Sequence, residues 1–351
     1  MPNPFFFAGK ITNPEHFVGR EKELKKIFSF LDTAHTGQIQ HVSVVGQRRI
    51  GKSSLLFHVS KVYSAQLSDH RNYRFVYLDL DNPHCHKLSG LLRYILEKLN
   101  LSPPAQPTLE RFYDLIEQDH ERRKVWPVFL MDEFEHLPER ATEFPDQFYD
   151  SLRSLGNNNI VGLVTGSQSK LQELASQGKL TSPFFNIFHQ IDLKEFSDTE
   201  ANVLLNRGRS SDHPFNDTDC TQILKIAGNH PARMQIVASL IYEAKANKQT
   251  LDWKAIKAEA QKEPPFNTNV SSRQNFYSRF ITPFRWILVA APKYAGHAIL
   301  VVIGRGEHTN GATDWIVGFI ALVVVTGVLL KVIPWSLVLY NISLPYMNKS
   351  L

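Results

Sequence analysis

Short apolar runs alternate with helical periodicities over the first two hundred residues. The first helical stretch, from Glu21 to Leu31, carries apolar side chains at i, i+3, i+4 and i+7, the spacing of one helix face. Strands alternating with helices are typical of an α/β fold, so we expect a five-stranded parallel, doubly wound sheet with helices on both faces. The expected strands are 41–45, 73–80, 125–131, 160–167 and 188–193.

After the last expected strand the pattern becomes helical only, and further on its composition changes. Helices are predicted from Asp198 to about residue 260, with a tight turn at Gly228-Asn229-His230-Pro231. Paired prolines and small polar residues then predict a linker, and an apolar region follows it. We therefore divide the chain into a core at 1–196, a helical region at 197–262, a linker at 263–283 and an apolar C-terminal region at 284–351.

The first expected strand runs into Gly46, and Gly51-Lys52-Ser53 opens the next helix. This spacing, G-x-x-x-x-G-K-S between a strand and a helix, is that of a phosphate-binding loop. Its backbone N–H groups and the helix dipole favour a bound phosphate, Lys52 adds a point charge, and the Ser53 hydroxyl ligates Mg²⁺. The alternative is a chance pair of glycines in a turn. The expected nucleotide-binding residues here are Gly46, Gln47, Arg48, Arg49, Ile50, Gly51, Lys52, Ser53 and Ser54.

Two carboxylates follow the third expected strand. Because ligands bind outside the carboxyl ends of parallel strands, Asp132 is expected to hold Mg²⁺ opposite Ser53. Glu133 would then be the general base that orients an attacking water. The alternative is that the pair caps a helix over 133–137.

Hydroxyl groups end the fourth expected strand. Thr165 or Ser167 is expected to reach the γ-phosphate or the water, as a sensor of the nucleotide. The alternative for Ser167 is that it caps a helix over 168–174.

Composition adds little that is specific. A chain that is 43% hydrophobic and 21% charged is typical of a folded protein. The net charge of +5 is spread along the sequence and is weak support for a nucleic-acid partner. Two distant cysteines, Cys85 and Cys220, form no disulfide framework and fit a reducing cytoplasm.

The C-terminal region contains the chain's candidates for a membrane span. The best is 314–334, which is apolar and lies near Trp315, Trp335 and Tyr340, residue types that favour membrane interfaces. An earlier apolar stretch, 284–303, is interrupted by charged residues and proline, and would complete a hairpin. The alternative is a soluble module of buried strands or helices, because β-branched residues are frequent.

Five motifs in this order resemble the AAA+-related ATPases of the STAND class (signal-transduction ATPases with numerous domains), in their AAA-like bacterial and archaeal form. The resemblance covers roughly residues 5–250 and implies an ATP-binding core followed by a helical lid. It implies that Val18 and Gly19 lie near the adenine and that Pro231 covers it. Arg233 would approach the phosphates, whereas Arg20 would either contact the nucleotide or form a surface ion pair with 21–23. The motifs are 17–21, 46–53, 130–133, 164–167 and 228–232.

The resemblance implies a switch in which ADP holds a closed state and exchange for ATP permits assembly. We therefore expect an ATP-binding, slowly hydrolysing switch in bacterial signalling or defence, cytoplasmic and anchored to the inner membrane. ATP or ADP with Mg²⁺ would be its cofactors, and a second copy or an effector or sensor protein its partner. Family members usually continue into repeats, which are missing here, so the signal is open. One alternative is a DNA-associated initiator-like ATPase. It would need a winged-helix domain, for which the apolar tail leaves no room, so nucleic acid is not the expected partner. The other alternative is a soluble nucleotide-binding scaffold with little turnover.

Overall fold

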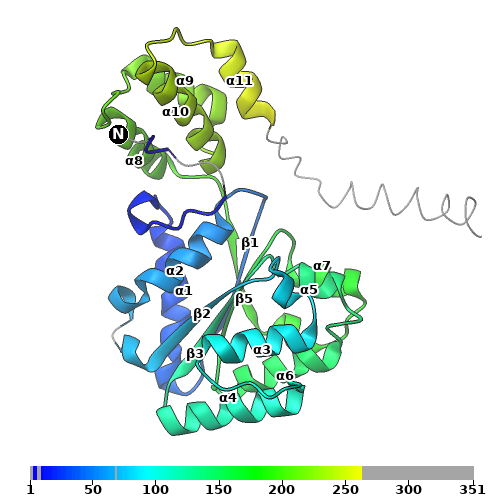
Figure 1. Ribbon diagram of the computed structural model, residues 1–351. Helices are drawn as coiled ribbons and strands as arrows, with labels where there is room; N and C mark the ends of the chain where they lie inside the picture. Colours follow the sequence, from blue (N-terminus) through cyan, green and yellow to red (C-terminus); the bar gives the residue numbers. More distant parts are fainter. Residues whose placement is uncertain (1–2, 6–8, 68, 263–351) are drawn as a thin grey trace, which may run out of the picture. The chain divides into compact units, whose positions relative to one another are not determined.

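The computed structural model describes residues 3–5, 9–67 and 69–262. Its centre is a five-stranded sheet in the order β2-β3-β4-β1-β5, with every neighbouring pair parallel (Figure 1). The expectation of a five-stranded parallel α/β sheet is therefore confirmed. The strands are β1 His41–Gly46, β2 Tyr73–Asp79, β3 Trp126–Asp132, β4 Gly162–Ser167 and β5 Phe188–Leu193.

The strand that follows the first in sequence is not its neighbour in the sheet. β2 lies at one edge, and β4 lies between β1 and β3, pairing Val42 with Val164 and Leu130 with Val164. Because all five strands are parallel, their carboxyl ends meet along one edge of the sheet. Gly46 from β1 and Asp132 from β3 consequently end at that edge on either side of β4.

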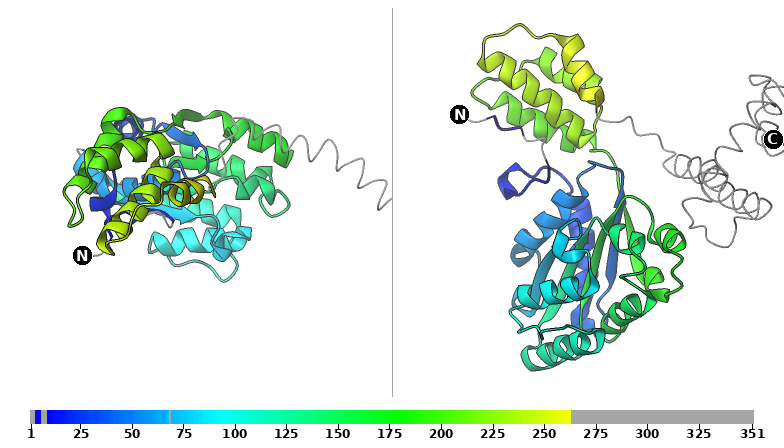
Figure 2. Two further views of the ribbon diagram at one scale, coloured as in Figure 1. Left: turned by 90° about the horizontal axis from the view of Figure 1, so that it is seen from above. Right: turned by 45° about the vertical axis from the view of Figure 1, so that its right-hand side comes forward.

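Helices cover both faces of the sheet, as Figures 1 and 2 show. Alternate residues of each strand point to opposite faces, so Val128 and Leu130 join one core and Phe129 and Met131 the other. The first core lies beneath α1 (Glu21–Leu31) and α2 (Lys52–Gln66). The second lies beneath α3 (Leu88–Lys98), α4 (Leu109–Arg123), α5 (His136–Glu139), α6 (Asp146–Asn157) and α7 (Leu171–Gly178).

The last four described helices form a separate core. Ser197 and Glu200 make a capping box at the start of α8, and Asn216 and Asp219 make another at the start of α9. The buried ring of Phe5, from the N-terminal segment, stacks on a ring of this core at 5.2 Å. The helices are α8 Asp198–Arg209, α9 Asp217–Ala227, α10 Pro231–Ala246 and α11 Trp253–Lys262, and they belong to the same compact unit as the sheet.

Two helices begin later than the sequence pattern predicts. α5 begins at His136 because Glu133 has a left-handed backbone with φ 53°, and its N-cap residue Glu135 makes no side-chain cap. α7 begins at Leu171 after Lys170, which also makes no cap. The capping alternatives for the carboxylate pair and for Ser167 are therefore wrong. Polar residues at these strand ends are not explained by helix capping.

The apolar stretches 284–303 and 314–334 and the predicted linker lie outside the described residues. Within the described part of the chain, no helix is both long and apolar enough to cross a membrane.

Candidate functional site

The loop after β1 has the backbone that a phosphate cradle requires. Gly51 has a φ of 105° and Arg49 a φ of 61°, so the chain passes through the left-handed region twice before α2 begins. A side chain on Gly46 would lie 2.9 Å from the carbonyl oxygen of Leu193, so glycine is needed there for close packing. The loop and the N-terminus of α2 therefore present backbone N–H groups together.

Lys52 is held within the loop. Its Nζ donates to the carbonyl oxygens of Gly46 at 2.9 Å and Gln47 at 3.0 Å, and the residue is 4% exposed. Burial lowers the pKa of Lys52, while the charges of Glu133, Glu135 and Asp132 oppose that shift. The ammonium group is thus a positive charge facing carboxylates at the edge of the sheet, as phosphate binding requires.

Ser53 and Asp132 meet as the sequence predicts. Burial raises the pKa of Asp132, and hydrogen bonds from the Tyr77 and Ser53 hydroxyls oppose the rise. A hydroxyl and a carboxylate are hard oxygen ligands, and Mg²⁺ at such sites keeps waters and phosphate oxygens for its other positions. The pair therefore fits Mg²⁺. No group of three or more His, Cys, Asp or Glu residues that could hold a metal ion occurs in the described ranges.

Glu133 has the environment of a general base. It lines the cavity described below, and its left-handed backbone turns the chain away from β3. Its pKa is raised to about 7, chiefly by burial and also by the charges of Glu135 and Asp132, while the charge of Lys52 opposes the rise. A carboxylate with a pKa near neutrality accepts a proton more readily than an ordinary one.

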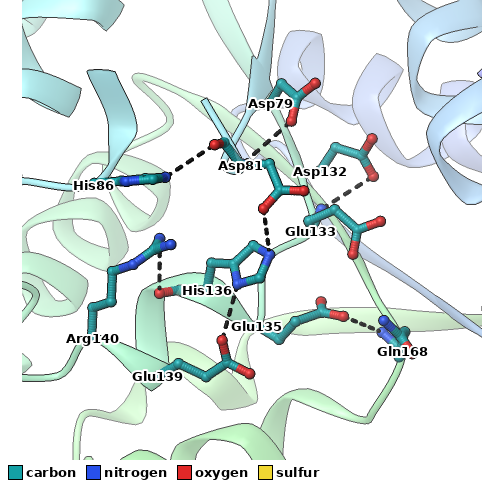
Figure 3. Close-up of polar contacts among 10 residues, drawn as sticks. All are labelled: Asp79, Asp81, His86, Asp132, Glu133, Glu135, His136, Glu139, Arg140 and Gln168. Carbon is teal, nitrogen blue, oxygen red and sulfur yellow. Dashed lines mark hydrogen bonds and ion pairs between the residues drawn. The ribbon is translucent and has the colours of Figure 1, made fainter. Parts of the chain in front are cut away.

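Figure 3 shows how carboxylates gather where β2 and β3 end. Asp79 and Asp132 are register partners on the two strands. His136 pairs with Asp81 at 2.8 Å and with Glu139 at 2.9 Å. The chain after β3 is therefore held by the contacts of His136 with Asp81 and Glu139.

The predicted sensor residues point to the other face of the sheet. Leu163 packs in the core beneath α3–α7, and alternation places Thr165 and Ser167 on the same face. Both residues are fully buried, and neither lines the cavity. Gly166 is the residue of this strand end that faces Asp132: a side chain there would lie 3.2 Å from Oδ1 of Asp132.

A cavity of about 240 Å³ joins the loop to the helical region. Of the predicted nucleotide-binding residues, Gly19, Gly46, Gln47 and Arg233 do not line it, and the others do. Pro231 and Gln235, one turn apart on α10, face it from the helical region. The lining residues are Gly9, Lys10, Ile11, Phe17, Val18, Arg20, Arg48, Arg49, Ile50, Gly51, Lys52, Ser53, Ser54, Glu133, Phe196, Pro231, Ala232 and Gln235.

Arg20 is not a surface residue. It is 3% exposed, its guanidinium lies 4.7 Å from the centre of the Phe196 ring, and one nitrogen donates to the carbonyl oxygen of Ile50 at 2.9 Å. The ion pair with Glu23 is present at 3.8 Å but is buried on the arginine side. The surface ion-pair alternative is therefore wrong, and Arg20 connects the phosphate loop to the chain before α8.

The N-terminal segment supplies cavity residues that sequence reasoning missed. Lys10 and Ile11 line the cavity, and the backbone N–H of Ile11 donates to Oγ of Ser54 at 3.0 Å. No motif or periodicity marks these positions. Lys10 is an isolated lysine after an aromatic run, and its hydrogen bonds are with residues more than sixty positions away.

The sheet order, the glycine-lysine-serine loop and the carboxylates at the carboxyl edge define a P-loop NTPase of the AAA+-like type. The chain belongs to the family described as Novel STAND NTPase 2, whose profile matches residues 38–264. A comparison with curated proteins found no match.

Solved structures with the same fold come from Aeropyrum pernix and Pyrococcus abyssi. The ORC2 protein of Aeropyrum pernix, in ADPNP–ADP complexes, is 14% identical with a TM-score of 0.60, over 99% of this chain and 89% of that one. The Walker-type ATPase PABY2304 of Pyrococcus abyssi is 16% identical with a TM-score of 0.52, over 89% and 91%. The Aeropyrum pernix ORC1 protein in complex with DNA is 14% identical with a TM-score of 0.51, over 86% and 77%. Likeness at these identities establishes the fold.

Proposed function

We propose that the protein is an ATP-binding and slowly ATP-hydrolysing molecular switch. The observation that carries the proposal is the convergence of Lys52, Ser53, Asp132 and Glu133 at the carboxyl edge of one sheet, with three of the four lining a single cavity. Each of these residue types is suited to one part of phosphoryl transfer to water.

Each group has one role in this proposal. Lys52 and the loop N–H groups bind the phosphates, and Ser53 with Asp132 would hold Mg²⁺. When bound, Mg²⁺ neutralises charge on the phosphate oxygens. Glu133 accepts a proton from the attacking water, since its pKa of about 7 favours that exchange at neutral pH.

Nucleotide binding with and without hydrolysis tests these roles. Glu133→Gln keeps the loop, Lys52 and Asp132, so it should bind ATP with an affinity close to that of the full-length wild-type chain. Lys52→Ala should lose ATP binding, because it removes the charge held by the loop. Equal ATP affinity in wild type and Lys52→Ala would contradict the assignment of the cavity to nucleotide.

The switch itself is proposed to act through the helical region, which serves as a lid. Pro231, Ala232 and Gln235 line the cavity beside the phosphate loop, so a bound nucleotide would contact α10 directly. Amide hydrogen exchange in α8–α10 is expected to differ between two states: Glu133→Gln with bound ATP, and wild type with bound ADP. Identical exchange in the two states would argue for a scaffold that binds nucleotide without switching.

We further propose that residues 284–351 anchor the protein to the cytoplasmic face of a membrane, and that it acts in bacterial signalling or defence with a second copy or an effector protein. Support comes from the uncharged composition of 315–330. Fractionation beside a chain truncated at Pro265 tests the anchor. Full-length protein in the membrane pool, resistant to alkaline carbonate, would support it, and full-length protein that is soluble without detergent would contradict it.

DNA association is the second candidate, because the ORC1 structure of similar fold is a DNA complex. Phosphate contacts would make any binding fall steeply with salt. Retention of duplex DNA at low salt, lost as salt rises, would favour this candidate over membrane anchoring.

A further inference from the structure

The hydroxyl of Tyr77 lies against the predicted metal ligand. Tyr77 is on the edge strand β2, and its Oη is 2.5 Å from Oδ2 of Asp132 at the end of β3. The other carboxylate oxygen, Oδ1, accepts the backbone N–H of Glu133 at 3.1 Å. Both oxygens of Asp132 are therefore fixed, one by its own loop and one by a neighbouring strand.

A lysine from the N-terminal segment completes the chain of contacts. Nζ of Lys10 is 3.2 Å from Oη of Tyr77 and 3.1 Å from Oδ2 of Asp79, and it lies 4.4 Å from the centre of the Tyr77 ring. Lys10 also lines the nucleotide cavity. The contacts thus run from the cavity wall to Asp132 through one tyrosine.

The direction of the hydrogen bonds follows from the chemistry of the three groups. An ammonium group only donates and an ionised carboxylate only accepts. Lys10 must therefore donate to the oxygen of Tyr77, and the one hydroxyl proton of Tyr77 is left for Asp132. Such aligned chains strengthen each bond within them.

We propose that Tyr77 is a positioning residue for Asp132, with Lys10 orienting its hydroxyl, so that the carboxylate is held in the geometry that binds Mg²⁺. This inference rests on the proposed function, since it assigns a role toward Mg²⁺ and nucleotide. Ser53, whose hydroxyl also contacts Asp132, marks the side on which the cation binds. Outer partners of metal ligands typically affect metal affinity by about 10–100-fold.

Tyr73 provides a matched control on the same strand. Tyr73 is buried, whereas Tyr77 is half-buried, and the Tyr73 hydroxyl donates to the carbonyl oxygen of Leu31 at 3.1 Å, far along the strand from Asp132. Tyr77→Phe and Tyr73→Phe each remove one hydroxyl. The first loses the bond donated to Asp132 and the bond accepted from Lys10, and the second loses the bond donated to Leu31. Only the first removes a contact with the predicted metal ligand.

The measurement is the binding of a fluorescent ATP analogue to the full-length chain, titrated with Mg²⁺ and repeated in EDTA. Tyr77→Phe should need roughly tenfold more Mg²⁺ for half-maximal tightening of nucleotide binding, with unchanged affinity in EDTA. Tyr73→Phe should match wild type in both. Mn²⁺, which binds such sites more tightly than Mg²⁺, should restore metal-dependent nucleotide binding to Tyr77→Phe.

If nucleotide binding by Tyr77→Phe tightens at the same Mg²⁺ concentration as in wild type, the inference about Tyr77 is overturned, but the proposed function is not. If the nucleotide affinity of the wild-type chain does not depend on Mg²⁺, the metal role of Asp132 is overturned as well. A loss in EDTA equal to the loss in Mg²⁺ would show that Tyr77 supports only the fold.

The role of Lys10 is tested by a double-mutant cycle. Lys10→Met should raise the Mg²⁺ requirement in wild type but not in Tyr77→Phe. In Tyr77→Phe, Lys10→Met no longer acts through the tyrosine hydroxyl and only removes the lysine partner of Asp79. The negative charge of Asp79 then attracts the cation, so the Mg²⁺ requirement should not rise. Lys61→Met, an exposed lysine on α2, is the control. An equal loss in both backgrounds would show that Lys10 acts independently of Tyr77.

Discussion

Gly19 and Glu200 pack closely where the segment before α1 meets α8: a side chain on Gly19 would lie 2.6 Å from Oε1 of Glu200. Gly19 also has a φ of 71°, which favours glycine. The same carboxylate accepts the backbone N–H of Arg20 and completes the capping box of α8. Burial alone would raise the pKa of Glu200, and these hydrogen bonds lower it overall. One acidic side chain thus places Val18 and Arg20 at the cavity.

Gly19→Ala is therefore expected to destabilise the protein and weaken nucleotide binding. Backbone strain contributes roughly 1–2 kcal/mol, and the clash with Glu200 adds to it. Gly37→Ala is the matched control, since Gly37 has a φ of 93° but open space around it. Thermal unfolding and ATP titration should show a larger loss for Gly19→Ala in both quantities. Equal losses would remove the steric role of Glu200.

Thr165→Val should leave turnover nearly unchanged. The Thr165 hydroxyl is fully buried on the face opposite α2, and its Oγ1 has no hydrogen-bond partner among the described residues. Replacing it with a methyl group of similar shape should stabilise the fold by about 1 kcal/mol. Chemical denaturation and phosphate release measure the two effects, with Thr165→Ser as the variant that keeps the hydroxyl. A hundredfold drop in turnover for Thr165→Val would restore the sensor role predicted from sequence.

Stability should fall on acidification partly because of His41. Burial lowers the pKa of His41 to about 4, and its Nδ1 accepts the backbone N–H of Leu163. The folded protein keeps His41 neutral, whereas the unfolded chain binds a proton below its ordinary value of 6.5. This contribution to the free energy of unfolding is therefore complete above that pH and is lost between 6.5 and 4, by up to roughly 3 kcal/mol.

His41→Asn keeps an acceptor for Leu163 without a titrating group, so its unfolding free energy should vary less between pH 7 and 4 than that of wild type. The control is His84→Asn, because His84 is exposed. Urea unfolding at several pH values makes the comparison. Parallel pH curves for wild type and His41→Asn would show that His41 is not responsible.

The parts of the site that were predictable from sequence are those encoded locally. Each of these residues ends a strand or follows one within a few positions, so a strand pattern and a short motif are enough to predict that they meet at one edge. They are Lys52, Ser53, Asp132 and Glu133. Thr165 shows where that reasoning stops. Its distance from the strand end was evident, but the face to which it points depends on which alternate residues pack beneath α3–α7.

Long-range contacts could not be predicted in the same way. Tyr77 lies within the strand predicted at 73–80, yet its contact with Asp132 depends on the register of β2 with β3. Lys10 reaches Tyr77 across 67 residues, from a segment with no periodicity of its own. The burial of Arg20 likewise depends on Phe196, which precedes α8.

Phosphate release from ATP by the full-length chain with Mg²⁺, under single-turnover conditions, tests the central claim most directly. Wild type should release phosphate slowly, and Glu133→Gln should lower the rate by about 100-fold or more while ATP remains bound. Unchanged phosphate release in Glu133→Gln would remove Glu133 as the base. No release by wild type with ATP fully bound would contradict hydrolysis and leave a nucleotide-binding scaffold.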